Sequence, residues 1–521
     1  MPVRTASVLY RGGRIYCPGL PQATALLVRD GRIAWLGADE DAPRADEVVD
    51  LAGALVTPAF VDAHVHMTDT GRLLSGLDLS AARSAAEVLD AVAACAGNLP
   101  GDAVVVGHGW DESTWGEPTL PSAAELDRAA GGRPVYLTHA SMHAALCSTA
   151  LLARAPVAST PDVDSSGLVR GDAHVVVRQA ALGAIPRAQR SAWQRRALRH
   201  AASLGIAAVH ECGGPGICEE DDFTGLLALS GDGLPEVYGY WGELGAAAKA
   251  RDLGAVGAGG DLHVDGAIGA HTAFVSTPYA DRGGHGCAYL TVDHVRDHLL
   301  DCAAHGVQGG FHAIGDAAID TVVRGMAAAA ETLGVEWLRA ARHRVEHALL
   351  ATKQLIARFV EFGVIASVQP SFDRLWGGPS GMYAQRLGPQ RALEANPLGA
   401  MHTVGVSLAF GSDAPVTPLD PWGSIRAAIS HANPTQRISV RAAFAAHTRG
   451  GWRAVGRDAD GTLVPGAAAT FAVWDTPAGL AEGLPVLVAA DPAARGPHDP
   501  TPLPVCRRTV LRGTVIYQAD A

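Results

Sequence analysis

The chain has 521 residues, of which 48% are hydrophobic and 18% are charged, and its formal net charge at pH 7 is −12. This length favours one large catalytic domain with a smaller companion, and the composition is that of a soluble globular protein. An acidic surface argues against nucleic acid and against an anionic membrane as main partners.

The cysteine pattern and the amino terminus indicate a cytoplasmic protein. Eight cysteines occur without any C-x-x-C pair, which is not the pattern of a disulfide-stapled secreted domain. The first residues, MPVRTASVLYRGGRIYCPG, contain no continuous apolar segment of the kind that a signal peptide needs. The chain also has no run of roughly 18 apolar residues, so we expect no membrane-spanning helix.

Both ends of the chain have the pattern of short strands joined by tight turns. RGG, RDG and LAG separate alternating strands near the amino terminus, and RTVLRGTVIY repeats the pattern near the carboxyl terminus. We therefore expect residues 1–57 and 453–521 to build one β-sandwich-like domain together. Residues 58–452 form the remaining domain, with an insertion at about 67–205.

The middle of the chain alternates strand-like apolar runs with helical stretches rich in Ala, Leu and Arg, which favours a parallel sheet. Eight runs can be counted, the number of strands in a TIM-like (β/α)8 barrel of the α/β class. The expected barrel strands are residues 59–64, 206–211, 236–241, 262–266, 309–313, 344–348, 364–369 and 407–412.

The strongest local signal is VDAHVHM at 61–67, at the end of the first expected barrel strand. Side chains alternate along a strand, so His64 and His66 point to the same side, about 7 Å apart. Two imidazoles in this arrangement can share one divalent cation. The competing interpretation is a pair of partly buried histidines without a metal.

Three further residues lie at or just past the ends of expected strands. They are His312 in GGFHAIGD, His347 in RVEHALL and Asp413 in AFGSDAPV. Enzymes on a barrel of this kind place their catalytic groups at the carboxyl ends of the strands. Each histidine alone could be a core residue, but together with the H-x-H pair they indicate a metal site.

These motifs resemble the amidohydrolase superfamily, and most closely its amidohydrolase family 3, or YtcJ-like, branch. The motifs are HVH at 64–66, HAIGD at 312–316, RVEH at 344–347 and GSDAPV at 411–416. GWDESTW at 109–115, SMHAALCSTALL at 141–152 and VDGAIGAHTAFVSTPYAD at 264–281 also match, in the family's order. The resemblance is specific for the family and weak for the substrate.

The resemblance implies roles for the strand-end residues. His64 and His66 would bind metal, His312 and His347 would be ligands or lie next to them, and Asp413 would act as general base and then as proton donor. This agrees with the chemistry, because a divalent metal lowers the pKa of a bound water towards about 7. A carboxylate beside that water can take and return the proton.

The sequence departs from the family at the residue that bridges two metals. Many binuclear members use a carboxylated lysine on the fourth strand, but the matching place, just before LHVDG, is Asp261. Neither of the two lysines, Lys249 and Lys353, lies at an expected strand end. Two interpretations remain: Glu211, in AVHECGG at the end of the second strand, bridges two metals, or one metal is bound by His64, His66, His312 and Asp413 while His347 orients water.

Four residues are expected to contact the substrate. His143 lies in the SMHAALCS match, Asp265 and His271 flank GAIG, and Trp110 could line an apolar pocket. The family more often has arginine at the His271 position, so the family's substrate contact at this residue does not carry over to this chain.

The leading functional hypothesis is a metal-dependent hydrolase that cleaves a C–N bond in a small molecule: a non-peptide amide, a cyclic amide or an N-acyl or N-formyl group. One alternative is a single-metal deaminase of an amino-heterocycle, and another is a non-catalytic barrel that acts as a binding protein. Histidine and carboxylate ligands suit zinc, although iron and manganese also fit, and one or two ions remain open. A homodimer is compatible with the apolar surface that such barrels often bury.

Overall fold

The computed structural model describes two compact units. One consists of residues 1–66 and 198–521, and the other of residues 67–197. The described residues are 6–101, 103–112, 115–117, 119–139, 144–155, 166–488 and 499–520.

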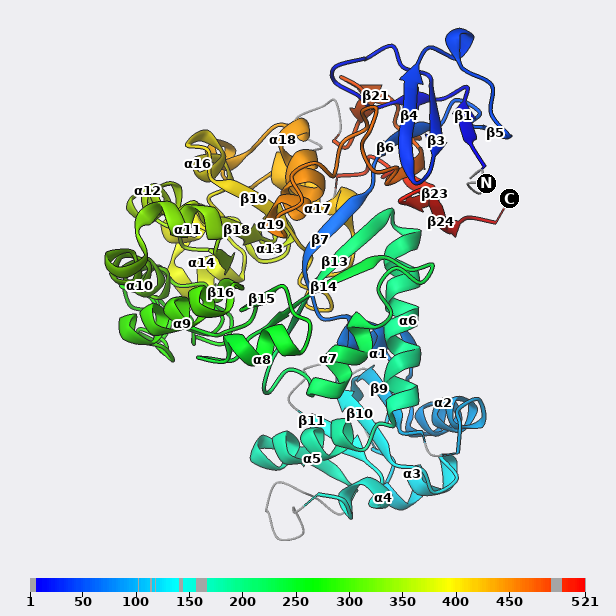
Figure 1. Cartoon of the computed structure of the whole chain (residues 1–521). Coiled ribbons are helices and arrows are strands. Elements are labelled where there is room, and N and C mark those ends of the chain that lie inside the picture. The colour runs from blue at the N-terminus through cyan, green and yellow to red at the C-terminus, as the bar shows by residue number, and fades with distance from the viewer. Residues whose placement is uncertain are drawn as a thin grey trace. The chain divides into compact units, whose positions relative to one another are not determined.

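The larger unit contains an eight-stranded parallel sheet that closes almost completely into a barrel (Figure 1). Its strands run in chain order around the sheet, and the last strand returns to the first through a bridge between Val65 and Ala414. The strands are β7 (Phe60–Val65), β13 (Ile206–Gly213), β14 (Glu236–Trp241), β15 (Gly257–Ala258), β16 (Gln308–Ala313), β17 (Arg344–His347), β18 (Ile365–Val368) and β19 (Ser407–Phe410). This confirms the α/β barrel expected from the sequence.

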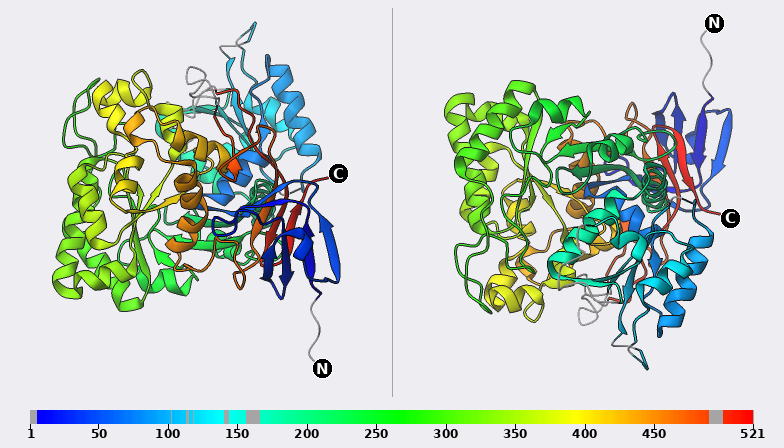
Figure 2. Two further views of the ribbon diagram at one scale, coloured as in Figure 1. Left: turned by 90° about the horizontal axis from the view of Figure 1, so that it is seen from above. Right: turned by 90° about the horizontal axis from the view of Figure 1, so that it is seen from below.

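Helices lie on the outside of the barrel strands, and those that follow β15 to β17 are coloured green to yellow in Figure 2. Helix α10 shows why they pack there: it buries Ile319, Val322 and Met326 on one face, at the spacing of an amphipathic helix. The helices are α7 (Glu220–Leu227), α8 (Ala247–Asp252), α9 (Val292–His305), α10 (Asp316–Leu333), α11 (Val335–Ala341), α12 (Lys353–Phe362), α13 (Pro370–Trp376), α14 (Met382–Leu387), α15 (Pro389–Glu394), α16 (Leu398–Thr403), α17 (Pro421–Ile429), α18 (Val440–Ala445) and α19 (Gly451–Ala454).

The fourth barrel strand is not where the sequence pattern places it. The expected strand was 262–266, but β15 spans Gly257–Ala258, and only an isolated bridge joins His263 to His312 farther along. The true strand has little apolar character because its neighbours demand glycine. A Cβ on Gly257 would lie 2.6 Å from the Tyr240 ring, and one on Gly259 would lie 2.4 Å from the backbone of Gly310.

The chain ends build two further sheets of the larger unit, as expected. One is formed by β4 (Arg32–Gly37), β3 (Ala25–Arg29), β1 (Val8–Arg11) and β5 (Glu47–Asp50). The other combines both termini: β2 (Arg14–Ile15), β6 (Leu55–Pro58), β20 (Phe471–Asp475), β23 (Val505–Leu511) and β24 (Thr514–Gln518). Buried Ile33, Val56 and Phe471 belong to one core shared by both sheets. Since β6 leads directly into β7, this core anchors the first barrel strand.

Residues 67–197 form a unit with a core of its own. The strands of its sheet lie in the order β12 (Leu168–Arg170), β11 (Ala144–Cys147), β10 (Val135–His139), β9 (Val105–Trp110) and β8 (Leu77–Asp78). Its helices are α1 (Met67–Ser75), α2 (Ala85–Gly97), α3 (Ala123–Ala129), α4 (Thr149–Leu152) and α5 (Gly171–Gly183), and α6 (Arg187–Ser203) leads back to the barrel. In the described part of the chain, every helix is too short or too polar to cross a membrane.

Candidate metal centre

His64 and His66 lie at the carboxyl end of β7, and their orientation is fixed from behind. His64 is fully buried, and its Nδ1 lies 2.9 Å from Glu346 Oε2, so Nδ1 carries the proton that the carboxylate accepts. The opposite nitrogen, Nε2, has no hydrogen-bond partner among the described residues and lies 3.5 Å from Asp261 Oδ1 and 3.6 Å from Asp413 Oδ1. His66 Nε2 lies 3.2 Å from both Asp261 Oδ2 and Asp413 Oδ1.

His347 and Asp413 reach this point through left-handed backbone. Glu346 points into the barrel, so an extended residue at 347 would point outward; with φ at 69°, His347 instead turns its ring to within 4.9 Å of the His64 ring centroid. Asp413 has φ at 57°, and its N–H donates to the carbonyl of His64 over 2.7 Å. Such conformations cost about 1–3 kcal/mol for residues other than glycine, and they cluster at functional sites.

His312 completes the set of expected histidines, from the end of β16. Its Nδ1 lies 3.4 Å from Asp261 Oδ1, while its Nε2 faces the carbonyl of Gly266 at 3.5 Å. Burial and the neighbouring His347 lower the pKa of His312 to about 4, so this imidazole is neutral near pH 7 and offers a lone pair.

Asp261, which the strand-end pattern does not indicate as a ligand, lies at the centre of these residues. Its side chain is 9% exposed, and Oδ1 also lies 3.6 Å from His347 Nε2. Burial opposes its charge, but His64, His312 and His347 hold the pKa of this carboxyl well below its ordinary value. The apolar pattern predicts the fourth strand too late in the chain, so Asp261 precedes the expected strand, whereas in the structure it follows β15.

We call these six residues the strand-end cluster: His64, His66, Asp261, His312, His347 and Asp413. Ligand atoms of His64, His66 and Asp261 lie within 4.8 Å of one another, as do those of His64, His347 and Asp413. Ligand bonds of about 2 Å place two ligand atoms of a tetrahedral zinc ion about 3.3 Å apart. The nitrogen–oxygen distances of 3.2–3.6 Å in the cluster match that spacing.

The electrostatics of the cluster also fit a cation. Burial opposes a charge on His64, yet Cys212 and Asp261 raise its pKa well above the ordinary value; for His66, Asp261 and Asp413 outweigh burial in the same way. The two carboxylates therefore attract positive charge to this point. A divalent ion can replace the protons on the inward-facing nitrogens and use the same lone pairs.

A second group of charged and polar residues lies one layer deeper, at the level of β17 before His347. We call it the buried network: Arg344, Glu346, His210 and Ser367. Arg344 donates to both oxygens of Glu346 at 2.8 and 2.9 Å and to Ser367 at 3.0 Å. Its Nη1 donates to His210 Nδ1 at 2.9 Å, and Nη2 donates to the carbonyl of Ala63 at 2.6 Å. Through Glu346 this network holds His64, and through Ala63 it holds the strand that carries His64.

Glu211, which bridges two metals in one of the two interpretations left open by the sequence, is not brought to the strand-end cluster. Its neighbour Cys212 points inward, with Sγ grouped with His64 and Glu346. Alternation therefore directs Glu211 to the other face. Gly213, on that same face, lies against Phe223 of α7. This placement supports a structural role for Glu211 on the helix side of the sheet.

Two of the residues expected to contact substrate lie in the loop after β15, and the structure shows other contacts for them. Asp265 is fully buried and accepts hydrogen bonds from the N–H groups of Phe274, Ile314 and Gly315 at 2.8–3.0 Å. Its carboxylate therefore ties this loop to the end of β16. His271 stands where the family more often has arginine, and it is paired with Asp281 at 3.0 Å. Its imidazole therefore already has a negatively charged partner within the protein.

The remaining two expected substrate contacts belong to residues 67–197. Trp110 is 1% exposed, its Nε1 donates to the carbonyl of Leu137 over 2.8 Å, and it belongs to that unit's core. This placement is that of a packing residue. His143 lies outside the described residues.

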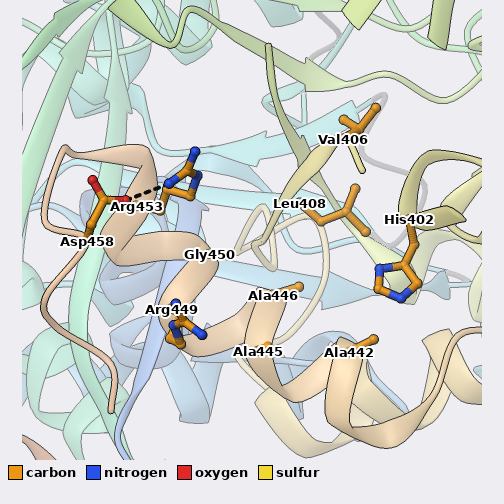
Figure 3. A pocket seen from close by; sticks show the side chains of 10 residues that line it. All are labelled: His402, Val406, Leu408, Ala442, Ala445, Ala446, Arg449, Gly450, Arg453 and Asp458. Atoms are coloured by element: carbon orange, nitrogen blue, oxygen red, sulfur yellow. Dashed lines mark hydrogen bonds and ion pairs between the residues drawn. The ribbon is translucent and has the colours of Figure 1, made fainter. Parts of the chain in front are cut away.

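A pocket of about 220 Å³ lies at the opposite end of β19 from Asp413 (Figure 3). Its lining includes Val406, just before β19, Leu408 near the start of that strand, and the exposed His402. Arg453 at its edge is paired with Asp458 at 2.7 Å. Because catalytic groups of a barrel follow the carboxyl ends of its strands, this pocket is not part of the candidate centre.

Comparison with known proteins agrees with the expected family. The chain matches the family model described as "Amidohydrolase family" over residues 47–517. It is 26% identical to the putative amidohydrolase YtcJ of Bacillus subtilis, with 98% of this chain and 99% of the relative covered. It is 25% identical to an N-substituted formamide deformylase of Arthrobacter pascens, with 87% and 90% covered.

A solved structure is similar over nearly the whole chain. A metal-dependent hydrolase from Pyrococcus furiosus superposes with a TM-score of 0.74 at 26% identity, covering 90% of this chain and 98% of that one. This similarity shows that the chain and that hydrolase share one barrel fold.

Proposed function

We propose, since the chain belongs to the amidohydrolase family, that it is a metal-dependent hydrolase of C–N bonds in small molecules. The proposed substrates are non-peptide amides, cyclic amides and N-acyl or N-formyl amines. The observation that carries the proposal is the strand-end cluster, where imidazole nitrogens face carboxylate oxygens at 3.2–3.6 Å. Spacing of this kind suits ligands of one ion better than direct hydrogen bonds.

The residues that would hold the cation are His64, His66, Asp261 and Asp413. His64 fits because its protonated Nδ1 is engaged by Glu346 while its buried Nε2 has no hydrogen-bond partner in the described part of the chain. Two imidazoles and two carboxylates form a donor set that suits zinc, which is the metal we propose. A bound divalent cation supplies Lewis acidity to a carbonyl oxygen and lowers the pKa of a water.

Asp413 and His347 are proposed to handle the proton. His347 Nδ1 lies 2.9 Å from Gln369 Oε1, so Nδ1 carries the hydrogen and Nε2 can accept a hydrogen bond from the attacking water. Asp413 takes one proton from that water as the water oxygen bonds to the carbonyl carbon. It then returns the proton to the leaving nitrogen as the C–N bond breaks, which yields an amine and a carboxylic acid.

A product assay tests the proposal. Zinc-reconstituted protein is incubated with N-formyl amines, N-acyl amines, cyclic amides and amino-heterocycles, and amine, carboxylate and ammonia are measured. The relative named N-substituted formamide deformylase makes N-formyl amines the first group to try. We expect amine and carboxylate in equal amounts, loss of both in His66→Asn, and full retention in His402→Gln. Ammonia release from an amino-heterocycle, with no amide cleaved, would overturn the proposal in favour of a deaminase.

A further inference from the structure

The pocket at the amino end of β19 combines aliphatic surface with cationic side chains (Figure 3). Its aliphatic surface comes from five side chains: Val406, Leu408, Ala442, Ala445 and Ala446. The ionisable residues of its lining are Arg449, Arg453, Asp458 and His402. A pocket with an apolar floor and a few charged groups suits a ligand that has an apolar body and a negatively charged end.

The two arginines of this lining differ in whether their charge is already paired. Arg453 is paired with Asp458 at 2.7 Å, and its Nε donates to Ser407 Oγ over 3.2 Å. Arg342 donates to the same carboxylate over 2.7 Å, so Asp458 serves two guanidinium groups. Arg449 is exposed, and its guanidinium has no ion pair or hydrogen bond with any residue that the structure describes. Because arginine stays protonated, Arg449 presents an uncompensated positive charge at this pocket.

The backbone that carries Arg449 is a π-helical turn, Ala446–Gly450. It joins α18 to α19 with right-handed helical backbone at both ends, so the three segments form one continuous helix. A Cβ on Gly450 would lie 2.1 Å from the carbonyl oxygen of Leu408, so glycine lets this helix lie directly against β19. Single π-helical turns are rare and occur frequently at functional sites. The turn is therefore a second feature, besides the unpaired charge, that distinguishes this wall of the pocket.

The size of the pocket and the number of its unpaired charges limit the ligand. Its volume of about 220 Å³ equals that of roughly seven water molecules, so a ligand of roughly eight non-hydrogen atoms fills it. A guanidinium binds a carboxylate through two parallel hydrogen bonds. One unpaired guanidinium balances one carboxylate, whereas a phosphate monoester carries a charge of about −1.5 to −2 at pH 7.

We infer that this pocket binds a small aliphatic monocarboxylate, with Arg449 holding the carboxylate and Leu408 and Ala442 contacting the aliphatic body. The inference goes beyond the proposed function and does not depend on it, because the pocket lies at the opposite end of β19 from Asp413.

The experiment is isothermal titration calorimetry of the zinc-loaded full-length protein with hexanoate at low ionic strength. We expect saturable binding of about one hexanoate per chain in the wild type. Arg449→Gln should raise the dissociation constant by about 10- to 100-fold, which is the contribution of a hydrogen bond to a charged group. Ala442→Leu keeps a good helix former and fills the pocket, so it should weaken binding by at least about 10-fold.

Three controls accompany these variants. Arg324→Gln makes the same change on α10, where the side chain is 66% exposed and does not line the pocket, and it should bind hexanoate as the wild type does. Hexan-1-ol, which has the same body without the charge, should bind at least about 10-fold more weakly. Circular dichroism and the melting temperature show that each variant is folded.

The competing location is the strand-end cluster, because a carboxylate can also bind a metal ion. His66→Asn alters the proposed cation site and should leave hexanoate binding unchanged. Loss of binding in His66→Asn, with wild-type binding in Arg449→Gln, would place hexanoate at the strand-end cluster and overturn the inference.

Three other results would also overturn the inference. They are no hexanoate binding in the wild type, wild-type affinity in both Arg449→Gln and Ala442→Leu, and inorganic phosphate bound as tightly as hexanoate. Amide hydrolysis is measured in a separate assay, so failure of the proposed function and failure of this site are distinguishable.

Discussion

The buried network and the strand-end cluster are adjacent layers of one barrel. Charged groups are in direct hydrogen-bond contact in the first and are spaced farther apart in the second. In the buried network, Arg344 meets its acceptors at 2.6–3.0 Å. In the strand-end cluster, nitrogens and carboxylate oxygens face one another at 3.2–3.6 Å, and His64 Nε2 has no hydrogen-bond partner among the residues that the structure describes. In the deeper layer the charges of Arg344 and Glu346 neutralise each other directly, although His210 Nε2 has no hydrogen-bond partner among the described residues. In the upper layer, we propose, a cation takes that role.

The largest expected effect comes from opening the deeper layer. Arg344→Met leaves the buried charge of Glu346 with only His64 Nδ1–H as a donor, and breaking a buried pair in this way costs about 3–5 kcal/mol. We expect a correspondingly large drop in the urea concentration at the unfolding midpoint. The double variant Arg344→Met/Glu346→Leu removes both charges and should recover most of the loss. Equal stability of Arg344→Met and the wild type would show that the deeper layer does not support the fold.

Changing the upper layer should affect activity and spare stability. Asp413→Asn removes the proposed proton carrier and should lower kcat/KM by about 100- to 10,000-fold. Asparagine tolerates left-handed backbone, so the φ of 57° at this residue predicts an unchanged melting temperature. A near-normal kcat/KM in the Asp413→Asn enzyme would exclude Asp413 as the proton carrier.

A smaller effect is expected where a neutral residue supports the cluster. Gln369 is fully buried and accepts from His347 through Oε1, but its Nε2 has no partner among the described residues. Gln369→Met keeps the volume and removes an unsatisfied donor, but it also leaves the buried Nδ1–H of His347 without its acceptor, so we expect a loss of stability of about 1–2 kcal/mol. Activity should drop by about 10- to 100-fold as His347 loses its fixed tautomer. An unchanged kcat in the Gln369→Met enzyme would mean that Gln369 does not act through His347.

The smallest effect should come from a pair outside the barrel interior. Glu236, at the start of β14, accepts from Arg512 of the terminal sheet region at 3.1 Å. Burial favours its neutral form, but Arg512 and Tyr238 lower its pKa below the ordinary 4.5. A lowered acid pKa stabilises the fold above pH 4.5, and this contribution is lost as pH falls through the folded-state pKa.

We therefore expect Glu236→Gln to cost about 1 kcal/mol at neutral pH, as is typical of a partly exposed pair. The difference from the wild type should shrink as the pH is lowered below 4.5. Urea unfolding of both proteins between about pH 3 and 7 measures it. A difference that stays constant with pH would mean that the charge of Glu236 is not what stabilises the fold.

Strand patterns in the sequence predicted most of the barrel but not its fourth strand. Seven expected strands overlap observed ones, because apolar runs that end at polar residues mark buried parallel strands. The fourth is Gly257–Ala258, where close neighbours exclude larger side chains. A strand made of glycine and alanine has no hydrophobic period to detect.

The site residues could also be predicted only where a motif or an apolar strand marks them in the sequence. His64, His66, His312, His347 and Asp413 were found by motif and strand end, and the structure brings all five together. Glu211 also lies near the end of a strand, but Cys212 is the residue of β13 that points into the barrel. Which of the two points inward depends on the register of the strand, which the sequence does not show. Asp261 depends on a bend after β15, a strand that has no apolar pattern in the sequence.

The most direct test of the account is an anomalous-difference map at the zinc edge from crystals of the reconstituted protein. The account predicts a peak about 2.0–2.2 Å from His64 Nε2, His66 Nε2 and a carboxylate oxygen of Asp413. Crystals of a protein that hydrolyses an amide, but with no anomalous peak at the strand-end cluster, would contradict it.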